Sequence, residues 1–321
     1  MDIRIGCGYM LDKNYIDKLI EKYSYDSKTI NALSKILPQL IEYYGEEYEE
    51  TILDAVYNCE IIACNSYQTI TKVEKEKELT KTQKTNQLKD INLKRNDSTY
   101  LTNIKISYDE LTNTFNIDKI KRTIVTAHTF NYDSPKGLEV LTYALCKLVK
   151  SYEKEYEVKE NKLIRKTGLA KEEMLIIKEK DDIYLVTEKE TGIGLEEGLT
   201  IYDTEQIVSM VLKDKYKCYD YDSVYTVAQI LKEKFKLLDL INYAEITKDD
   251  KELSKICSEE EKLKTHCDEC LKLEHEMFIS MQREEKNELA KQINNKLTKT
   301  IYKVLIETYE NYKKDKIKNN M

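Results

Sequence analysis

The fold is organised around residues 134–152, which read SPKGLEVLTYALCKLVKSY. Ser134 can cap a helix and Pro135 suits the first helical position, so we expect a helix to begin there. Apolar side chains then recur at helical spacing and form one stripe, made of Leu138, Leu141, Leu145, Leu148 and Tyr152. At about 100° per residue, Tyr143 and Lys147 point away from this stripe. We therefore expect one face of the helix to meet a core and the other face to serve a second purpose.

The second face resembles the active-site helix of zincins, the zinc metallopeptidases in which that helix reads H-E-x-x-H. Two His one turn apart bind the zinc there, and the Glu acts as base. The same frame here reads Tyr143-Ala144-Leu145-Cys146-Lys147. A phenol is a poor zinc ligand at neutral pH, an ammonium repels the metal, and Ala144 cannot activate a water molecule. The resemblance thus implies a zincin scaffold that has lost its metal and its catalytic residues, and we expect no cofactor.

A second segment carries the same resemblance. Residues 194–200 read GLEEGLT and are similar to the segment by which gluzincins supply a third zinc ligand, a Glu that begins a later helix. Glu197 occupies the place of that ligand. One interpretation is a solvated carboxylate in the first turn of a helix, which the helix dipole favours. The other is an ion pair with Lys147, because a partly buried carboxylate that has lost its metal needs a cationic partner.

The composition narrows the class of protein. The chain has 321 residues, of which 35% are charged and 41% hydrophobic, and its net charge is −7. A general nucleic-acid binder needs a basic face, so we do not expect nucleic acid as a partner. No apolar run approaches the ~20 residues that span a bilayer, and the first residues, MDIR, do not resemble a signal peptide. The eight Cys are scattered, which favours free thiols in the cytoplasm over disulfides.

Local patterns predict an α+β fold that is mostly helical. Residues 1–58 are expected to form helices, with a kink or restart at Pro38. Residues 60–64 fit a strand or a helix end, and the polar residues 73–99 fit a long surface loop or a charged helical hairpin. Strands are expected over 100–106, 122–127, 155–158, 162–165, 174–177 and 183–186. Further helices are expected over 203–214, 222–235, 237–247, 250–282 and 284–315.

This order of elements suggests three regions. Residues 1–99 would form a helical region with the polar loop, 100–200 a zincin-like α+β core with a small sheet, and 201–321 a helical C-terminal region. In the core, a strand, a turn and the helix over 135–152 follow one another in the order that zincins use. The resemblance covers residues 100–215.

Other candidate sites have weaker support. Cys267 and Cys270, with His266 and His275 nearby, are similar to a zinc-binding spacing. The segment has no turn signal, however, so thiols and imidazoles on a charged helix are the favoured interpretation. His128 follows a predicted strand and has no evident partner, which favours a surface role.

Three functions are compatible with these features. The resemblance favours a catalytically inactive, metallopeptidase-like pseudoenzyme that binds a protein or peptide in the former cleft, because pairing with an edge strand survives loss of the metal. One alternative is an enzyme with non-zinc chemistry at Tyr143, Lys147 and Glu197, marked by a shifted pKa of Lys147. The other is a purely helical interaction protein, in which the strands over 100–106 and 122–127 would not pair beside the helix.

Overall fold

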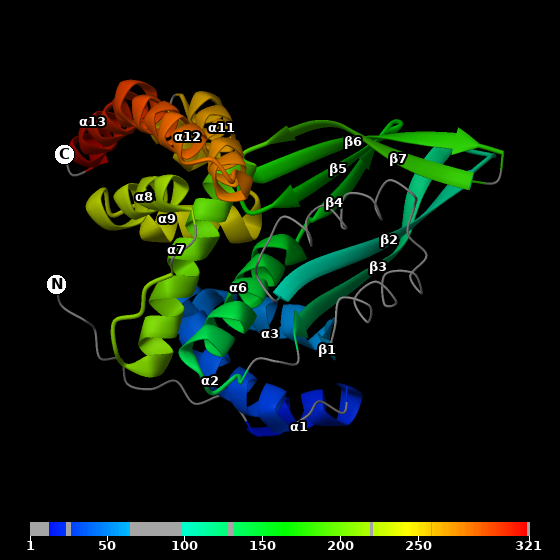
Figure 1. The fold of residues 1–321 in the computed structure, drawn as a ribbon. Coiled ribbons are helices and arrows are strands. Elements are labelled where there is room, and N and C mark those ends of the chain that lie inside the picture. Colours follow the sequence, from blue (N-terminus) through cyan, green and yellow to red (C-terminus); the bar gives the residue numbers. More distant parts are fainter. Residues whose placement is uncertain are drawn as a thin grey trace. The chain divides into compact units, whose positions relative to one another are not determined.

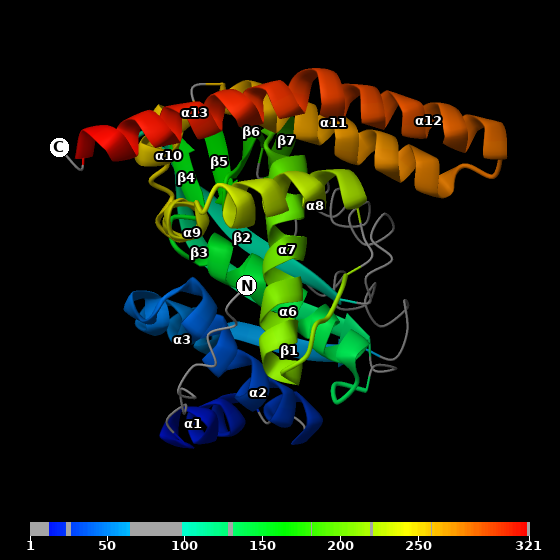
Figure 2. The same cartoon turned by 90° about the vertical axis from the view of Figure 1, so that its left-hand side faces the viewer.

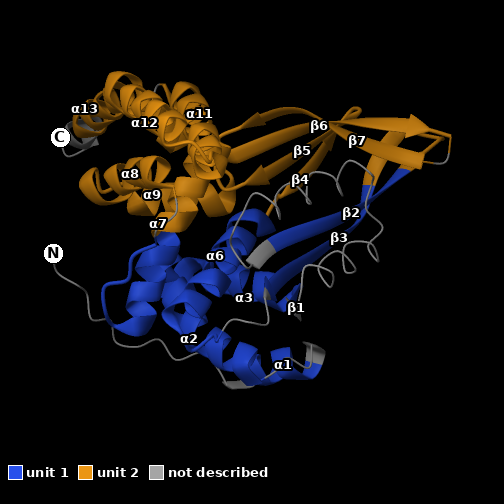
Figure 3. Cartoon of the chain, in the orientation of Figure 1, with its two compact units in different colours: residues 1–107, 117–152, 203–218 blue, residues 108–116, 153–202, 219–321 orange. Residues whose placement is uncertain are grey.

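A computed structural model describes residues 13–23, 27–64, 98–127, 131–180, 182–218, 221–257 and 259–319. It is an α+β fold that is mostly helical, as the sequence predicted (Figure 1). The chain divides into two compact units (Figure 3). Unit 1 comprises residues 1–107, 117–152 and 203–218, and unit 2 comprises 108–116, 153–202 and 219–321. The three regions predicted from the sequence, 1–99, 100–200 and 201–321, stay a prediction.

The N-terminal part of unit 1 is helical, as expected. Its elements are α1 (Lys13–Tyr23), α2 (Ser27–Tyr44), the short 3-10 helix η1 (Glu46–Tyr48) and α3 (Glu49–Tyr57). Pro38 lies inside α2, and the helix does not restart there. Apolar side chains on both sides of Pro38, including Leu37 and Leu40, are fully buried. Their burial offsets the ~3 kcal/mol that a proline costs in a helix interior.

A three-stranded sheet follows. It contains β1 (Cys59–Cys64), β2 (Ser98–Asp109) and β3 (Thr114–Ala127) in the order β1-β3-β2. The sheet belongs to unit 1 except for residues 108–116 at the end of β2 and the start of β3. β1 is a strand, parallel to β3, with Ile61 opposite Ile124. β2 and β3 are neighbours joined by residues 110–113, so they form an antiparallel hairpin. The purely helical alternative did not predict this hairpin. The polar segment over 73–99 falls largely outside the described residues.

Helix α6 (Pro135–Tyr152) follows β3 and has the predicted bounds. The hydroxyl of Ser134 accepts a hydrogen bond from the backbone N–H of Gly137 at 3.1 Å, which confirms the predicted cap. A Cβ on Gly137 would lie 2.2 Å from the carbonyl oxygen of Asn131, so only glycine fits against this turn. Most of α6 is buried, including the face that the apolar stripe leaves out. The sequence predicted that only one face of this helix meets a core, whereas residues on both faces are buried.

Unit 2 contains a four-stranded antiparallel meander in the order β4-β5-β6-β7. The strands are β4 (Tyr156–Lys159), β5 (Lys162–Thr167), β6 (Ala170–Glu179) and β7 (Asp182–Thr191). All four strands were predicted, and β6 and β7 are longer than the expected 174–177 and 183–186. Glu160 turns the first hairpin at a φ of 55°.

Helix α7 (Ile193–Leu212) is continuous from unit 2 into unit 1. The prediction of a separate helix beginning at residue 203 was therefore wrong. The rest of unit 2 is helical, as expected: α8 (Asp222–Gln229), a π-helical segment η2 (Ile230–Lys234), α9 (Leu238–Thr247), α10 (Lys251–Ile256), α11 (Glu260–Ile279), α12 (Arg283–Lys296), a second π-helical segment η3 (Leu297–Ile301) and α13 (Tyr302–Asn319). Figure 2 shows α11 and α12 side by side.

The predicted helix over 250–282 was wrong, because α10 ends at Ile256 and α11 begins at Glu260. Cys257 leaves the helical conformation with φ −96° and ψ 79°. Its buried thiol accepts a hydrogen bond from the hydroxyl of Thr308 in α13 at 3.3 Å. The break thus coincides with a tertiary contact, and the local sequence carries no Gly or Pro to mark it. In the described ranges, no helix combines the length and the apolar character that crossing a membrane requires.

Candidate functional site

The residues of the predicted degenerate site lie on two helices. Tyr143, Ala144 and Lys147 are on α6 in unit 1, whereas Glu197 is on the part of α7 that belongs to unit 2. Ala144 is fully buried and Tyr143 is only 6% exposed. The Lys147 ammonium lies 5.3 Å from the centroid of the Tyr143 ring, within cation–π range. The pairing of Lys147 with Glu197 stays a prediction.

Within unit 2, Glu196 and Glu197 are both buried. Glu197 is only 1% exposed, so the interpretation as a solvated carboxylate is wrong. The carboxylate of Glu196 accepts hydrogen bonds from the backbone N–H of Leu169 at 2.8 Å and from the hydroxyl of Thr200 at 3.1 Å. Glu196 therefore fixes the turn between β5 and β6 to the start of α7.

The two glycines of the GLEEGLT segment allow close helix packing. A Cβ on Gly194 would lie 2.2 Å from the carbonyl oxygen of Cys267 in α11. A Cβ on Gly198 would lie 2.2 Å from the carbonyl oxygen of Val224 in α8. Glycines four residues apart lie on one helix face, so α7 brings its backbone against two other helices of unit 2.

Asp268 of α11 caps this end of α7. Its two carboxylate oxygens accept hydrogen bonds from the backbone N–H groups of Gly192 at 2.8 Å and Gly194 at 2.6 Å. Burial raises the pKa of the Asp268 carboxyl above its usual value, and these two N–H groups partly oppose that shift. Asp268 thus has a structural role, which the sequence did not reveal.

The Cys and His residues near α11 have other contacts. Cys267 and Cys270 are free, buried thiols, and burial raises the pKa of Cys270 to about 11. His266 lies 2.9 Å from the carboxylate of Glu269, and His275 lies 2.6 Å from the hydroxyl of Tyr221. Across the part of the chain that the structure describes, no group of three or more His, Cys, Asp or Glu could hold a metal ion. His128 lies outside the described residues.

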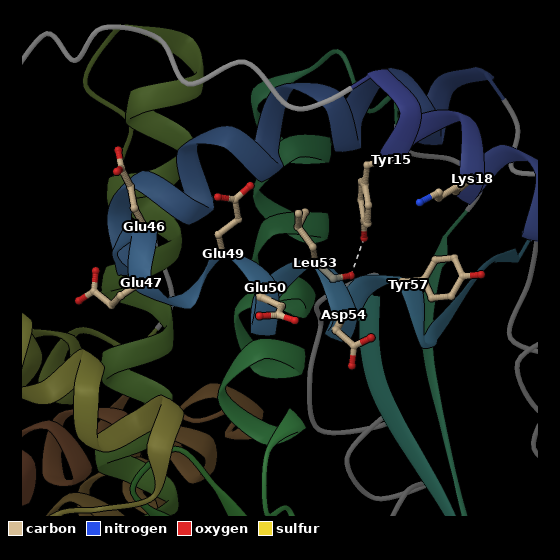
Figure 4. Close-up of a pocket in the computed structure, with 9 residues that line it drawn as sticks. All are labelled: Tyr15, Lys18, Glu46, Glu47, Glu49, Glu50, Leu53, Asp54 and Tyr57. Atoms are coloured by element: carbon tan, nitrogen blue, oxygen red, sulfur yellow. Dashed lines mark hydrogen bonds between the residues drawn. The ribbon is translucent and has the colours of Figure 1, made fainter.

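A surface depression in unit 1 offers a different site. Its volume is about 770 Å³, and it lies over α1, η1 and α3 (Figure 4). The lining residues are Tyr15, Lys18, Glu46, Glu47, Glu49, Glu50, Leu53, Asp54 and Tyr57. Five carboxylates thus share the depression with one ammonium, two phenol rings and one aliphatic side chain.

The carboxylates are spread out along the depression. Glu46 and Glu47 project from η1, while Asp54 lies farther along α3 (Figure 4). The hydroxyl of Tyr15 in α1 donates a hydrogen bond to the carbonyl oxygen of Leu53 at 2.5 Å. This bond holds α1 beside α3, so the two helices together form the site. The spread suits a ligand with several charges along its length better than a single ion, whose ligands must converge.

Asp54 is held in place at one end of the depression. It accepts hydrogen bonds from the side-chain amide of Asn58 at 2.9 Å and from the hydroxyl of Tyr152 at the end of α6. Burial and the nearby Asp54 carboxylate raise the pKa of Tyr152 to about 12. The Arg122 guanidinium lies 4.8 Å from the centroid of the Tyr152 ring. Contacts with Asn58 and Tyr152 thus fix the position of the Asp54 carboxylate at this end of the depression.

The depression combines negative charge with aromatic and aliphatic surface, a combination that suits cationic ligands. The sequence analysis did not single it out, although the run EEYEE over residues 46–50, followed by Asp54, was a visible signal. No protein-family model, no curated protein and no solved structure matches the chain.

Proposed function

We propose that the chain is a non-catalytic, peptidase-like protein that binds a basic, extended segment of another protein in the acidic depression of unit 1. The observation that carries this proposal is the lining of the depression: five carboxylates beside Tyr15, Leu53 and Tyr57, in an open volume of about 770 Å³. Carboxylates attract Lys and Arg side chains, and the phenol rings can pack against their aliphatic stems.

The dimensions fit a short stretch of extended chain. From Glu46 to Tyr57 the chain advances eleven residues, which is roughly 16 Å along a helix at about 1.5 Å per residue. An extended peptide covers that length with about five residues, because each spans ~3.3 Å. Alternate side chains of such a peptide point the same way, so two or three basic side chains would face the carboxylates.

The expected affinity is modest and depends on salt. An exposed ion pair contributes ~0.2–1 kcal/mol and is screened by salt. Two or three such pairs give only a few kcal/mol, so contact with Tyr15, Leu53 and Tyr57 must supply the rest. This energetic balance is typical of transient recognition of a flexible segment.

The peptidase-like part of the proposal rests on element order and on α6. β3, a short turn and α6 follow one another as the strand, turn and helix of a zincin do, and Tyr143, Ala144 and Lys147 occupy the H-E-x-x-H frame. The burial of Tyr143 and Ala144 favours a binding protein over an enzyme with new chemistry, because a substrate needs access to the reacting group. Cys146, Cys257, Cys267 and Cys270 form no disulfide, which supports the cytoplasm as the compartment.

The test is binding of a short fluorescein-labelled peptide in which Lys and Leu alternate, followed by fluorescence polarisation. The triple variant Glu46→Gln, Glu47→Gln, Glu50→Gln should weaken binding about three- to a hundredfold, because it removes three of the five carboxylates at ~0.2–1 kcal/mol each. The matched control, Glu276→Gln, Glu284→Gln, Glu288→Gln, removes three exposed carboxylates from α11 and α12. It should bind like the wild type. Equal losses in the two triple variants, or no binding by the wild type, would overturn the proposal.

A further inference from the structure

Two successive residues of α11 hold the start of α8 in unit 2. The carboxylate of Glu274 accepts a hydrogen bond from the backbone N–H of Ser223 at 2.8 Å. The imidazole of His275 lies 2.6 Å from the hydroxyl of Tyr221, and the two rings meet edge to face at 4.9 Å. Tyr221 itself has a φ of 51°, a left-handed conformation that L-residues with large side chains rarely adopt. The start of α8 therefore depends on tertiary contacts.

Glu274 is an unusual side chain for its surroundings. It is only 7% exposed. Leu271, three residues earlier on α11, and Val224, next to the bonded Ser223 of α8, both belong to the apolar core of unit 2. Among the described residues, the second carboxylate oxygen of Glu274, Oε2, has no hydrogen-bond partner. An ionised carboxylate in this position keeps one oxygen buried without compensation, which is unfavourable.

The neighbouring ionisable groups do not compensate the charge. The carboxylate of Asp222 at the start of α8 repels the Glu274 charge. The Glu274 charge in turn raises the pKa of the buried thiols of Cys267 and Cys270 on α11. The ammonium of Lys296 in α12 lowers the pKa of Cys270. Burial, as the largest effect, raises the pKa of Glu274 from 4.5 to about 7, and the backbone N–H and the side chain of Ser223 oppose this only in part.

We propose that Glu274 is a pH-sensitive latch: its neutral carboxyl group holds the first turn of α8 closed, and loss of the proton to solvent favours local opening of residues 221–229. The direction follows from linkage. A carboxyl whose pKa is higher in the closed state stabilises that state fully below its unfolded pKa, and this stabilisation is lost as the pH rises through the folded pKa. Opening therefore increases between pH 4.5 and pH 7 and levels off above about pH 7.

The size of the effect can be worked out. With a pKa of about 7 when closed and 4.5 when open, the opening equilibrium constant rises about tenfold between pH 6 and pH 8. Amide hydrogen exchange of residues 222–229, corrected for the intrinsic pH dependence of exchange, measures this change directly. Glu274→Gln keeps the acceptor for Ser223 and cannot ionise, so this variant should lose the tenfold change that Glu274 causes.

Two further variants complete the test. Glu276→Gln removes an exposed carboxylate from the same helix and should retain the tenfold change. Asp222→Asn removes the repelling charge at an exposed position, so the change should become smaller, and this variant serves if Glu274→Gln does not fold. A wild-type protein whose corrected protection is constant from pH 6 to pH 8, or a Glu274→Gln protein that shows the wild-type change, would overturn the proposal.

Discussion

Replacing Asp203 by Asn should strongly destabilise unit 1, because it removes the partner of a fully buried ammonium. Asp203 on α7 and Lys150 on α6 form an ion pair at 2.8 Å, and both side chains are 0% exposed. The same carboxylate accepts hydrogen bonds from the hydroxyls of Tyr43 at 2.5 Å and Tyr44 at 3.1 Å. One buried carboxylate thus joins α2, α6 and α7.

The expected loss is ~3–5 kcal/mol, the range found when one partner of a buried ion pair is removed. Asn keeps the shape of Asp and one oxygen acceptor, so the loss reports mainly the stranded charge of Lys150. Domains of this size are stable by only ~5–15 kcal/mol. The variant should therefore unfold at a much lower urea concentration, with little change in the m-value, when unfolding is followed by circular dichroism.

The chain provides a matched control and a compensating variant. Lys35 and Asp133 also form an ion pair at 2.8 Å, but their side chains are 42% and 57% exposed. Asp133→Asn should therefore lose at most ~1 kcal/mol. Adding Lys150→Met to Asp203→Asn removes both buried charges and should restore much of the stability. Equal losses for Asp203→Asn and Asp133→Asn would refute the argument from burial.

Three further predictions concern packing, charge and thiol chemistry. Gly198→Ala should lower the melting temperature, because the new Cβ would lie 2.2 Å from the carbonyl oxygen of Val224, an overpacking that costs ~1–3 kcal/mol; an unchanged melting temperature would contradict the close approach. If Lys147 and Glu197 pair, Lys147→Met should destabilise the protein more than Lys147→Met combined with Glu197→Gln, as urea titrations of a double-mutant cycle would reveal. Cys146 is fully buried and burial raises its pKa to about 12, so at pH 8 a thiol reagent should modify it only as fast as the protein opens; rapid modification of the native protein would contradict this.

The sequence predicted elements best where their ends depend on local chemistry. Helix α6 begins at Pro135 because Ser134 caps it, and both signals are visible in the sequence. The strands expected over 155–158 and 162–165 are likewise present and pair with each other as β4 and β5. Tertiary contacts decided the elements that were missed. The break at Cys257 lies where its thiol meets Thr308, fifty-one residues away in the chain.

The candidate site was harder to predict than the fold. The acidic run over residues 46–50 was visible, but the depression also needs α1, which the hydrogen bond from Tyr15 to Leu53 joins to α3. A sequence pattern cannot show which helix lies next to a charged segment. The role of Glu274 was missed for the same reason, since its position under the start of α8 is set by packing between helices distant in the chain.

The segment GLEEGLT shows how packing and ancestry can give the same sequence pattern. Gly194 and Gly198 are explained by the close approach of α11 and α8, and Glu196 by its hydrogen bonds to Leu169 and Thr200. None of these three residues needs a zincin ancestor, so the resemblance now depends on Lys147 and Glu197 being coupled. A coupling energy well above zero in the double-mutant cycle would show that Lys147 and Glu197 interact, as the proposed replacement of a metal by an ammonium requires. Additive losses would leave the packing of α7 as the sufficient reason for the segment.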